Sequence, residues 1–362
     1  MSKSNIKKIV VLTSGGDAPG MNAALRAVVR TALDNGIKVV GAYRGYNGLL
    51  NGDVKELSLR DVSGIIHRGG TVLYTARSTR FMEKEGILEA AKYCKKNGID
   101  AVVVIGGDGS FRGALDLCEV SKEIIKDGIP CIGIPGTIDN DISSSDYTIG
   151  FDTAMNTAMN MVDNIRDTSQ SHDRCSIVEV MGRHAGYIAL NTGIACGASM
   201  ILVPEVEYKK DENGESYVDY DDILNRCLNC IKETRATGKQ HFIIVVAEGV
   251  AEKIEGGVTR MAKDIENATK SWPELKKGIS DKIETRASIL GYVQRGGSPS
   301  MRDRVVATEM GSHAVELLLK GERNRVVVMK DDKIVDYDIN EALAMKKEFP
   351  MDLYEIATTV SK

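Results

Sequence analysis

The sequence has no apolar segment long enough to cross a membrane and none that resembles an export signal. The apolar run near its start, residues 9–12, is shorter than a signal-peptide core, and no stretch reaches about 18 apolar residues. The chain has 47 lysine and arginine residues against 51 aspartate and glutamate residues, a net charge of −4. This balance does not favour nucleic-acid binding. We therefore expect a cytoplasmic protein that acts without a membrane and without nucleic acid.

Cysteine is sparse and unpatterned. The seven cysteines are an odd number, and Cys227 and Cys230 form a C-x-x-C motif with no second pair nearby to complete a zinc site. The motif lies in a helical pattern, so we interpret it as part of a half-buried helix face. The five histidines show no H-x-x-x-H spacing. We expect reduced thiols and no transition metal.

Short β-branched runs alternate with helical patterns, which is typical of a doubly wound α/β fold. With 362 residues, the alternation favours two lobes. Strands are predicted at residues 8–13, 38–43, 101–105, 129–134, 176–181, 200–203, 242–247, 287–293, 325–329 and 333–337. Helices are predicted at residues 21–33, 112–126, 153–166 and 302–319.

Two glycine-rich loops follow predicted strands. Residues 13–22 read T-S-G-G-D-A-P-G-M-N and residues 106–110 read G-G-D-G-S, and each leads into a helix. Ligands of open α/β sheets bind beyond the carboxyl ends of strands, and a helix N-terminus favours phosphate. Neither loop matches the P-loop or the G-x-G-x-x-G pattern. The pair predicts a phosphate site of another kind.

Three aspartates accompany these loops. Asp108 lies inside the second loop, where a carboxylate can hold Mg²⁺ beside bound phosphates. Asp139 and Asp141 lie in P-G-T-I-D-N-D, directly after the strand at 129–134. Two carboxylates so close suit proton abstraction or metal-linked positioning. Alternatively, Asp108 caps the helix and the other two form an Asx-rich turn.

Arginines recur in turns beside later strands, where a guanidinium can grip phosphate with two hydrogen bonds. These arginines are Arg174, Arg183, Arg286 and Arg295. Two other segments, 208–222 and 252–281, are charged or polar and carry no chemical motif, although the second holds the single tryptophan, Trp272. We interpret both as solvent-exposed insertions.

Together, these motifs resemble those of the 6-phosphofructokinases, in family order across residues 8 to about 315. The matching segments are T-S-G-G-D-A-P-G-M-N, I-G-G-D-G-S, P-G-T-I-D-N-D, T-I-G-F-D-T-A, S-H-D-R, E-V-M-G-R, P-E-V-E, E-T-R and Q-R-G-G-S-P. The resemblance implies two Rossmann-like three-layer lobes with mostly parallel sheets and an active site in the cleft between them. A nucleotide-binding lobe would comprise residues 1–150 and 294–345, and a fructose 6-phosphate-binding lobe residues 151–293 and 346–362.

The resemblance also implies a reaction, the committing step of glycolysis, in which the γ-phosphoryl group of Mg-ATP moves to the 1-hydroxyl of fructose 6-phosphate. Asp139 would be the base, Asp108 the Mg²⁺ ligand, and ATP the co-substrate. The implied catalytic residues are Asp139, Thr137, Asp141, Gly16 and Arg183. The implied nucleotide-binding residues are Gly16, Arg77, Gly109, Ser110 and Gly113. The implied sugar-phosphate residues are Thr137, Asp139, Arg174, Met181, Gly182, Arg183, Glu248, Arg286, Tyr292 and Arg295.

The resemblance implies that Arg174 and Arg286 reach the substrate of a neighbouring subunit, so that activity needs an oligomer. Members of the family are typically allosteric homotetramers. Arg26, Arg30, Arg166, Lys239 and His241 resemble part of an effector site, in which Ser199 stands where the family has Glu. Met82 stands where an arginine is common, and Arg80 is a candidate replacement.

Three other functions stay open. Pyrophosphate-dependent relatives carry Asp at the position of Gly109 and Lys at that of Gly136, so the two glycines favour ATP. Nicotinamide-dinucleotide and lipid kinases share the G-G-D-G-[ST] loop but lack the P-G-T-I-D-N-D and M-G-R segments. A two-lobed sugar-phosphate sensor would explain the arginines and glycines, but not three aspartates around one phosphate site.

Overall fold

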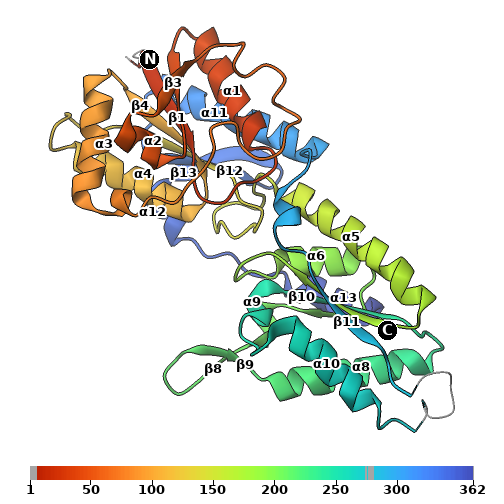
Figure 1. Ribbon diagram of the computed structural model, residues 1–362. Coiled ribbons are helices and arrows are strands. Elements are labelled where there is room, and N and C mark those ends of the chain that lie inside the picture. Colours follow the sequence, from red (N-terminus) through yellow and green to blue (C-terminus); the bar gives the residue numbers. More distant parts are fainter. Residues whose placement is uncertain (1–5, 274, 276–280, 362) are drawn as a thin grey trace. The chain divides into compact units, whose positions relative to one another are not determined.

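The computed structural model describes residues 6–273, 275 and 281–361 (Figure 1). The chain divides into two compact units, and each is formed from separate stretches of sequence. Unit 1 comprises Met1–Thr153 and Arg295–Lys347, and unit 2 comprises Ala154–Gln294 and Glu348–Lys362. The α/β class with mostly parallel sheets is confirmed.

Unit 1 is built on a seven-stranded sheet in the order β13-β12-β5-β4-β1-β2-β3. The inner strands run parallel, whereas β3 and β13 pair antiparallel at the two edges. The strands are β1 (Lys8–Thr13), β2 (Lys38–Ala42), β3 (Val54–Leu57), β4 (Ala101–Gly106), β5 (Cys131–Pro135), β12 (Arg325–Lys330) and β13 (Lys333–Asp338). β4 is buried along its whole length because helices cover both faces of the sheet.

Helices of unit 1 form a layer on each side of that sheet. α1 (Met21–Asp34) packs against α11 (Met301–Lys320), and α3 (Lys84–Lys96) packs against α4 (Asp108–Ser121). Alternate strand residues such as Val10, Leu12 and Val104 join the core beneath α3 and α4. Two further helices, α2 (Tyr46–Asn51) and α12 (Ile339–Ala344), and a 3₁₀ turn, η1 (Arg80–Met82), complete the described part of this unit.

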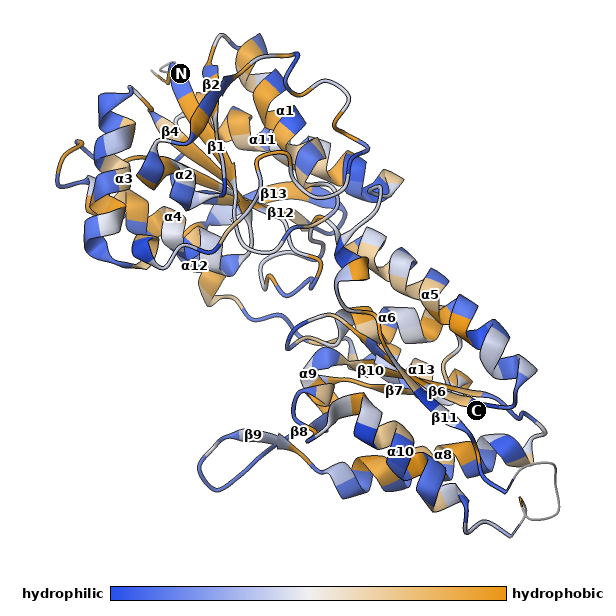
Figure 2. Cartoon of the chain, in the orientation of Figure 1, coloured by the Kyte–Doolittle hydropathy of each residue, from blue (hydrophilic) through white to orange (hydrophobic). Residues whose placement is uncertain are grey.

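Unit 2 is built on a four-stranded parallel sheet in the order β11-β6-β10-β7. Its strands are β6 (Cys175–Val180), β7 (Met200–Leu202), β10 (Phe242–Ala247) and β11 (Thr285–Ile289). Its helices are α5 (Phe151–Ser171), α6 (Tyr187–Ala195), α7 (Pro204–Glu207), α8 (Tyr220–Ala236), α9 (Glu248–Ala251), α10 (Gly257–Thr269) and α13 (Met351–Val360). Figure 2 shows apolar strands in both units and helices with a polar outer side.

Most predicted elements are present, with shifted ends. β1 and β10 have the predicted bounds, but α4 begins at Asp108 rather than at residue 112. The strand predicted at 287–293 ends at Ile289 and gives way to a 3₁₀ turn, η2 (Gly291–Arg295). The C-x-x-C pair lies on α8, where burial raises the pKa of the Cys227 thiol to about 12. A buried, protonated thiol agrees with a packing role.

The interpretation of residues 208–222 as solvent-exposed holds for most of that segment, and that of 252–281 is wrong in part. The first segment includes a hairpin of β8 (Tyr208–Lys210) and β9 (Ser216–Val218), which is largely exposed except for Val218, a core residue of unit 2. In the second, α10 buries Val258, Met261 and Ile265 against the sheet of unit 2. These residues recur at the spacing of one helix face, a signal that the polar average composition hides. Residues 274 and 276–280 of this segment lie outside the described residues.

Asp303, in the first turn of α11, is a fully buried hydrogen-bond acceptor in unit 1. Its carboxylate accepts from the Tyr147 hydroxyl at 2.6 Å, the Gly150 backbone N–H at 2.7 Å and the Thr153 N–H at 2.9 Å, and also from the Thr153 hydroxyl. Burial raises the pKa of Asp303, and these donors oppose the rise. The T-I-G-F-D-T segment is therefore tied to a helix that lies 150 residues further along the chain.

We expect Asp303→Asn to lower the free energy of unfolding by about 2–4 kcal/mol, because the amide accepts fewer of these buried donors. Urea denaturation of both proteins measures the difference. Asp332→Asn, at an exposed position, is the matched control and should change stability by less than about 0.5 kcal/mol. Equal stability of Asp303→Asn and the unchanged protein would contradict the assignment.

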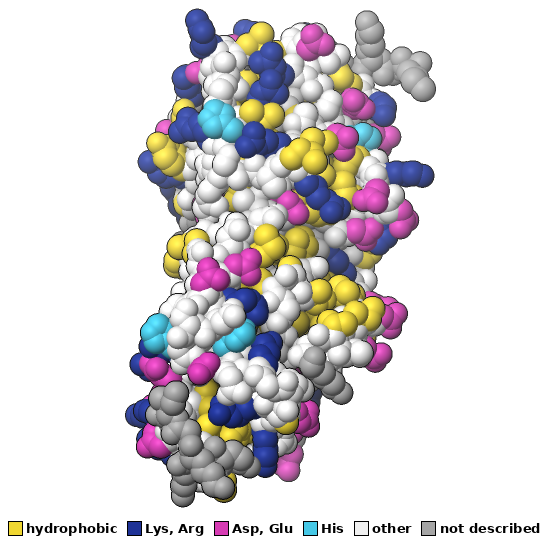
Figure 3. Space-filling view, turned by 90° about the vertical axis from the view of Figure 1, so that its right-hand side faces the viewer, with side chains coloured by type: hydrophobic (Ala, Val, Ile, Leu, Met, Phe, Trp, Pro, Cys, Tyr) yellow, Lys and Arg dark blue, Asp and Glu magenta, His cyan; other side chains and the backbone are white. Residues whose placement is uncertain are grey.

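Within the described part of the chain, no helix is both long enough and apolar enough to span a membrane. Charged side chains of both signs are interspersed on the face of each unit shown in Figure 3.

Candidate active site

Three predicted site loops lie side by side in unit 1. They follow β1, β4 and β5, which are neighbouring parallel strands, so their carboxyl ends meet at one edge of the sheet. The Ser14 backbone N–H donates to the Ile105 carbonyl at 3.0 Å, and the Gly136 N–H donates to the Gly106 carbonyl at 2.9 Å. The structure thus brings together the three segments that the sequence singled out for phosphate chemistry.

Close contacts surround two of the glycines in these loops, one with the backbone and one with a side chain. A Cβ atom on Gly106 would lie 2.4 Å from the Ser14 carbonyl oxygen, too near for any other residue. A Cβ on Gly16 would lie 2.8 Å from Nη1 of Arg295, which also donates to the Asp17 carbonyl at 3.1 Å. Arg295, predicted to bind the sugar phosphate, therefore lies against the first glycine loop, within unit 1.

The second glycine loop is largely the first turn of α4. Asp108 and Gly109 occupy the first two positions of this helix and Ser110 the third, so backbone N–H groups are available there for phosphate. No heavy atom lies within 4 Å of a Cβ built on Gly109. Gly113, one turn further, instead lies against Tyr46, whose hydroxyl donates to the Ser110 carbonyl at 2.6 Å.

Arg77 is exposed in the described chain, as an anion-binding side chain needs to be. Arg80, by contrast, forms an ion pair with Glu89. Met82 is 84% exposed. The pairing with Glu89 weakens the hypothesis that Arg80 takes the place of the family arginine.

Asp139 lies in a compact loop and is 5% exposed. Its backbone N–H donates to the Thr137 hydroxyl at 3.2 Å, and the Thr148 hydroxyl donates to the Thr137 carbonyl at 2.6 Å. Asn140 adopts a left-handed backbone conformation with φ of 53°, which turns the chain sharply between Asp139 and Asp141. Burial in such a loop fixes the direction of a carboxylate before a substrate binds.

Lys347, the last residue of unit 1, anchors this loop, and the sequence analysis did not select it. Its ammonium donates to the carbonyls of Asn140 and Ser145, each at 2.8 Å. Burial lowers the pKa of Lys347 to about 8, against the opposing attraction of Asp146 and Asp141. A lysine in a polar C-terminal stretch gives no sequence signal for such a contact.

The E-V-M-G-R segment forms a second site group, in unit 2. Met181, Gly182 and Arg183 follow β6, and the Glu248 carboxylate accepts from the backbone N–H groups of Gly182, at 3.1 Å, and Arg183. Gln294, which the sequence analysis did not select, accepts from the Met181 N–H at 2.8 Å. These bonds hold the segment in an unusual shape, in which Arg183 has φ of 59°.

Arg174 and Arg286 lie at the opposite end of the same sheet. They flank the first residues of β6 and β11, which pair in parallel from Cys175 and Thr285. β6 has six residues, so its two ends are about 20 Å apart. The structure therefore brings Arg174 and Arg286 together, but not with Met181, Gly182 and Arg183. Tyr292, in η2, is 83% exposed.

Three of the proposed effector residues also gather in unit 2. Burial lowers the pKa of Lys239, and Arg166 adds to the shift. Burial, Lys239 and Arg166 together lower the pKa of His241. Arg26 and Arg30 belong to α1 of unit 1. Arg166, Lys239 and His241 therefore form the part of the predicted effector site that lies within unit 2.

Glycine-rich loops at a helix N-terminus, beside a buried aspartate, define an α/β enzyme of the phosphoryl-transfer class. The phosphofructokinase family matches residues 8–318. ATP-dependent 6-phosphofructokinase of Clostridium botulinum strain Hall is 49% identical over 357 residues, covering 99% of this chain and 100% of that protein. The Bacillus cereus enzyme of the same name is also 49% identical, covering 98% of this chain and 100% of that protein. The chain belongs to the phosphofructokinase family.

Solved structures agree with this assignment. Phosphofructokinase from Saccharomyces cerevisiae superposes with a TM-score of 0.83 at 33% identity, covering 98% of this chain. This chain spans half of the yeast chain. A pyrophosphate-dependent phosphofructokinase from Marinobacter aquaeolei has a TM-score of 0.75 at 23% identity over 96% of this chain and 86% of that chain, which shows a shared fold.

The Lys347 contact predicts a pH dependence of stability. The pKa of Lys347 is about 8 in the folded protein, against the usual 10.5 of a lysine in an unfolded chain. Between these two pH values the unfolded chain binds more protons than the folded protein. Folding stability from this group therefore rises with pH across that window. We expect the free energy of unfolding of the unchanged protein, relative to that of Lys347→Met, to increase by up to about 3 kcal/mol between about pH 7.5 and pH 10. Denaturant unfolding at a series of pH values measures this, and a constant difference would show that Lys347 titrates as an exposed lysine.

Proposed function

We propose that this chain transfers the γ-phosphoryl group of ATP to the 1-hydroxyl of fructose 6-phosphate. The observation that carries the proposal is the buried Asp139, in the loop after β5, beside the glycine loops that follow β1 and β4. The names of the relatives, ATP-dependent 6-phosphofructokinase, support the same donor and acceptor. The enzyme acts in the cytoplasm, at the committing step of glycolysis.

The chemistry is a transfer between two oxygens. Asp139 accepts the proton of the 1-hydroxyl as that oxygen attacks the γ-phosphorus, and the bond to the bridging oxygen breaks to release ADP. The Gly16 N–H and the Arg77 side chain stabilise charge on the transferring group, and Thr137 and Asp141 support it. Most of the acceleration comes from positioning and charge stabilisation.

Magnesium fits this site through few protein ligands. No three His, Cys, Asp or Glu side chains gather into a metal-binding group among the described residues. Mg²⁺ in kinase sites takes one or two carboxylates and completes its shell with phosphate oxygens and water. Asp108, in the first turn of α4, is the proposed ligand. Asp108 would hold the ion there, and its positive charge would offset the negative charge of the phosphates.

The acceptor site uses both site groups of unit 2. Met181, Gly182, Arg183, Glu248 and Tyr292 hold the sugar phosphate, and the family resemblance implies the same ligand for Arg295. Arg174 and Arg286 serve the substrate of a neighbouring subunit, and the separation of about 20 Å between the two ends of β6 supports that arrangement. The active form is therefore an oligomer, which we propose to be an allosteric homotetramer.

The donor prediction is tested by following fructose 1,6-bisphosphate formation with ATP or pyrophosphate. We expect product with ATP alone. Gly109→Asp should abolish most ATP use. The space beside Gly109 is open, and the new carboxylate would occupy it and repel the ATP phosphates that we propose bind there. Gly109→Ala adds only a methyl group and is the control that should retain ATP use. Position 136 is less suitable, because a Cβ on Gly136 would lie 3.0 Å from Met21.

Product from pyrophosphate would show that the two glycines do not select the donor. Fructose 6-phosphate binding without turnover would favour the sensor, and neither binding nor turnover would favour another kinase. Unchanged ATP kinetics in Gly109→Asp would contradict the pocket assignment.

Asp139→Asn tests the proposed base. The amide is the same size but cannot take the proton, so kcat should fall by about 10²–10⁴-fold. Steady-state kinetics at saturating substrates measures the loss, and circular dichroism checks the fold. A kcat within about threefold of the unchanged enzyme would exclude Asp139 as the base.

A further inference from the structure

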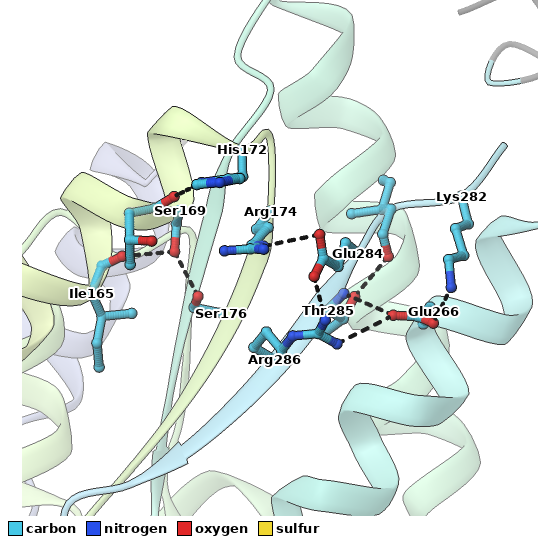
Figure 4. A network of polar contacts seen from close by, with 12 residues as sticks. Ile165, Ser169, His172, Arg174, Ser176, Glu266, Lys282, Glu284, Thr285 and Arg286 are labelled. Atoms are coloured by element: carbon cyan, nitrogen blue, oxygen red, sulfur yellow. Dashed lines mark hydrogen bonds and ion pairs between the residues drawn. The ribbon is translucent and has the colours of Figure 1, made fainter. Parts of the chain in front are cut away.

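One carboxylate lies between the two arginines at the start of β6 and β11 (Figure 4). Nε of Arg174 is 3.0 Å from Oε2 of Glu284, and the Arg286 guanidinium contacts Oε1 of the same side chain. Both oxygens of Glu284 are thus used, one for each arginine. The pairing fixes the separation of two guanidinium groups that would otherwise repel each other.

A second carboxylate supports the first. Glu266, on α10, accepts from the Lys282 ammonium at 2.5 Å and from the Thr285 backbone N–H at 3.3 Å. Its Oε2 also lies 4.0 Å from Nη1 of Arg286. The helix that the sequence analysis interpreted as a solvent-exposed insertion therefore holds the first residue of β11 and the arginine beside it.

Exposure differs between the two arginines in a way that suits an anion arriving from outside. The Arg286 side chain is 60% exposed, whereas that of Arg174 is 24% exposed. Arg174 lowers the pKa of Glu284, and Lys282 lowers that of Glu266, so both carboxylates are ionised at neutral pH. The exposed Arg286 guanidinium can present its positive charge to an approaching phosphate.

We propose that Glu284, supported by Glu266, is a positioning residue for sugar-phosphate binding. It holds Arg174 and Arg286 at a fixed spacing, so that both guanidinium groups meet the 6-phosphate bound to a neighbouring subunit. The inference rests on the proposed function. Ordering these two long side chains before binding reduces the conformational entropy that binding would otherwise cost.

Glu284→Gln is the first test. The amide is isosteric but uncharged, and its NH₂ group cannot accept from a guanidinium, so one arginine loses its support. We expect the KM for fructose 6-phosphate to rise about tenfold, while kcat and the KM for ATP change by less than about twofold. Glu255→Gln removes an exposed carboxylate 3.8 Å from Arg260 in the same unit and should change none of the three.

A double-mutant comparison shows whether Glu284 acts through the arginines. In an Arg174→Met background, the effect of Glu284→Gln on KM should shrink from about tenfold to less than about threefold. Additive effects would overturn the proposal, because they would mean that Glu284 acts independently of Arg174. Light scattering on each variant checks that assembly is unchanged.

A lower or unchanged KM in Glu284→Gln, with normal turnover by the unchanged enzyme, would overturn this inference and leave the proposed function intact. Absence of turnover in the unchanged enzyme would overturn both. If Glu284→Gln does not assemble, Glu266→Gln is a second variant that tests the same proposal. It should raise the same KM about threefold, and an unchanged KM would count against the support from α10.

Discussion

The parallel pairing of β1, β4 and β5 is the constraint on which the candidate site depends. Three loops separated by some 90 and 30 residues in sequence meet because parallel neighbours all end at one edge of a sheet. The glycines and the buried Asp139 follow from that arrangement: Gly106 must admit the Ser14 carbonyl, and Asp139 must turn inward from a short loop. The sheet supplies the positions, and these few residues supply the chemistry.

The chain passes between the two units three times, and at each passage a side chain forms hydrogen bonds within unit 1. Thr153 is bonded to Asp303, Arg295 donates to the Asp17 carbonyl, and Lys347 donates to Asn140 and Ser145. These three are the residues at which the chain leaves or re-enters unit 1. Asp17 and Asn140 belong to predicted phosphate loops. Hydrogen bonds therefore hold these boundary residues in unit 1, two of them at the loops that the proposed reaction uses.

Local signals allowed the sequence to predict the strands, the glycine loops and the paired aspartates, because a strand followed by glycine and aspartate shows within ten residues. Lys347 could not be predicted, since its contact with Asn140 spans 207 residues and exists only after folding. The role of Glu266 was predictable only in part. The spacing of Val258, Met261 and Ile265 indicates a buried helix face, but it does not indicate which arginine the helix contacts. The start of α4 was misplaced because glycines at its first turn look like a loop.

The division of unit 1 into two stretches of sequence has a consequence for synthesis on the ribosome. β12 pairs with β5, and Asp303 accepts hydrogen bonds from Gly150 and Thr153, yet α11 and β12 emerge only after the whole sheet of unit 2 has been made. The first 153 residues must wait with an open sheet edge beside β5 and with unsatisfied donors at Gly150 and Thr153. Unit 2 has all four strands of its sheet in one stretch, so it can form first, and the loop that carries Asp139 reaches its final support last, when Lys347 arrives.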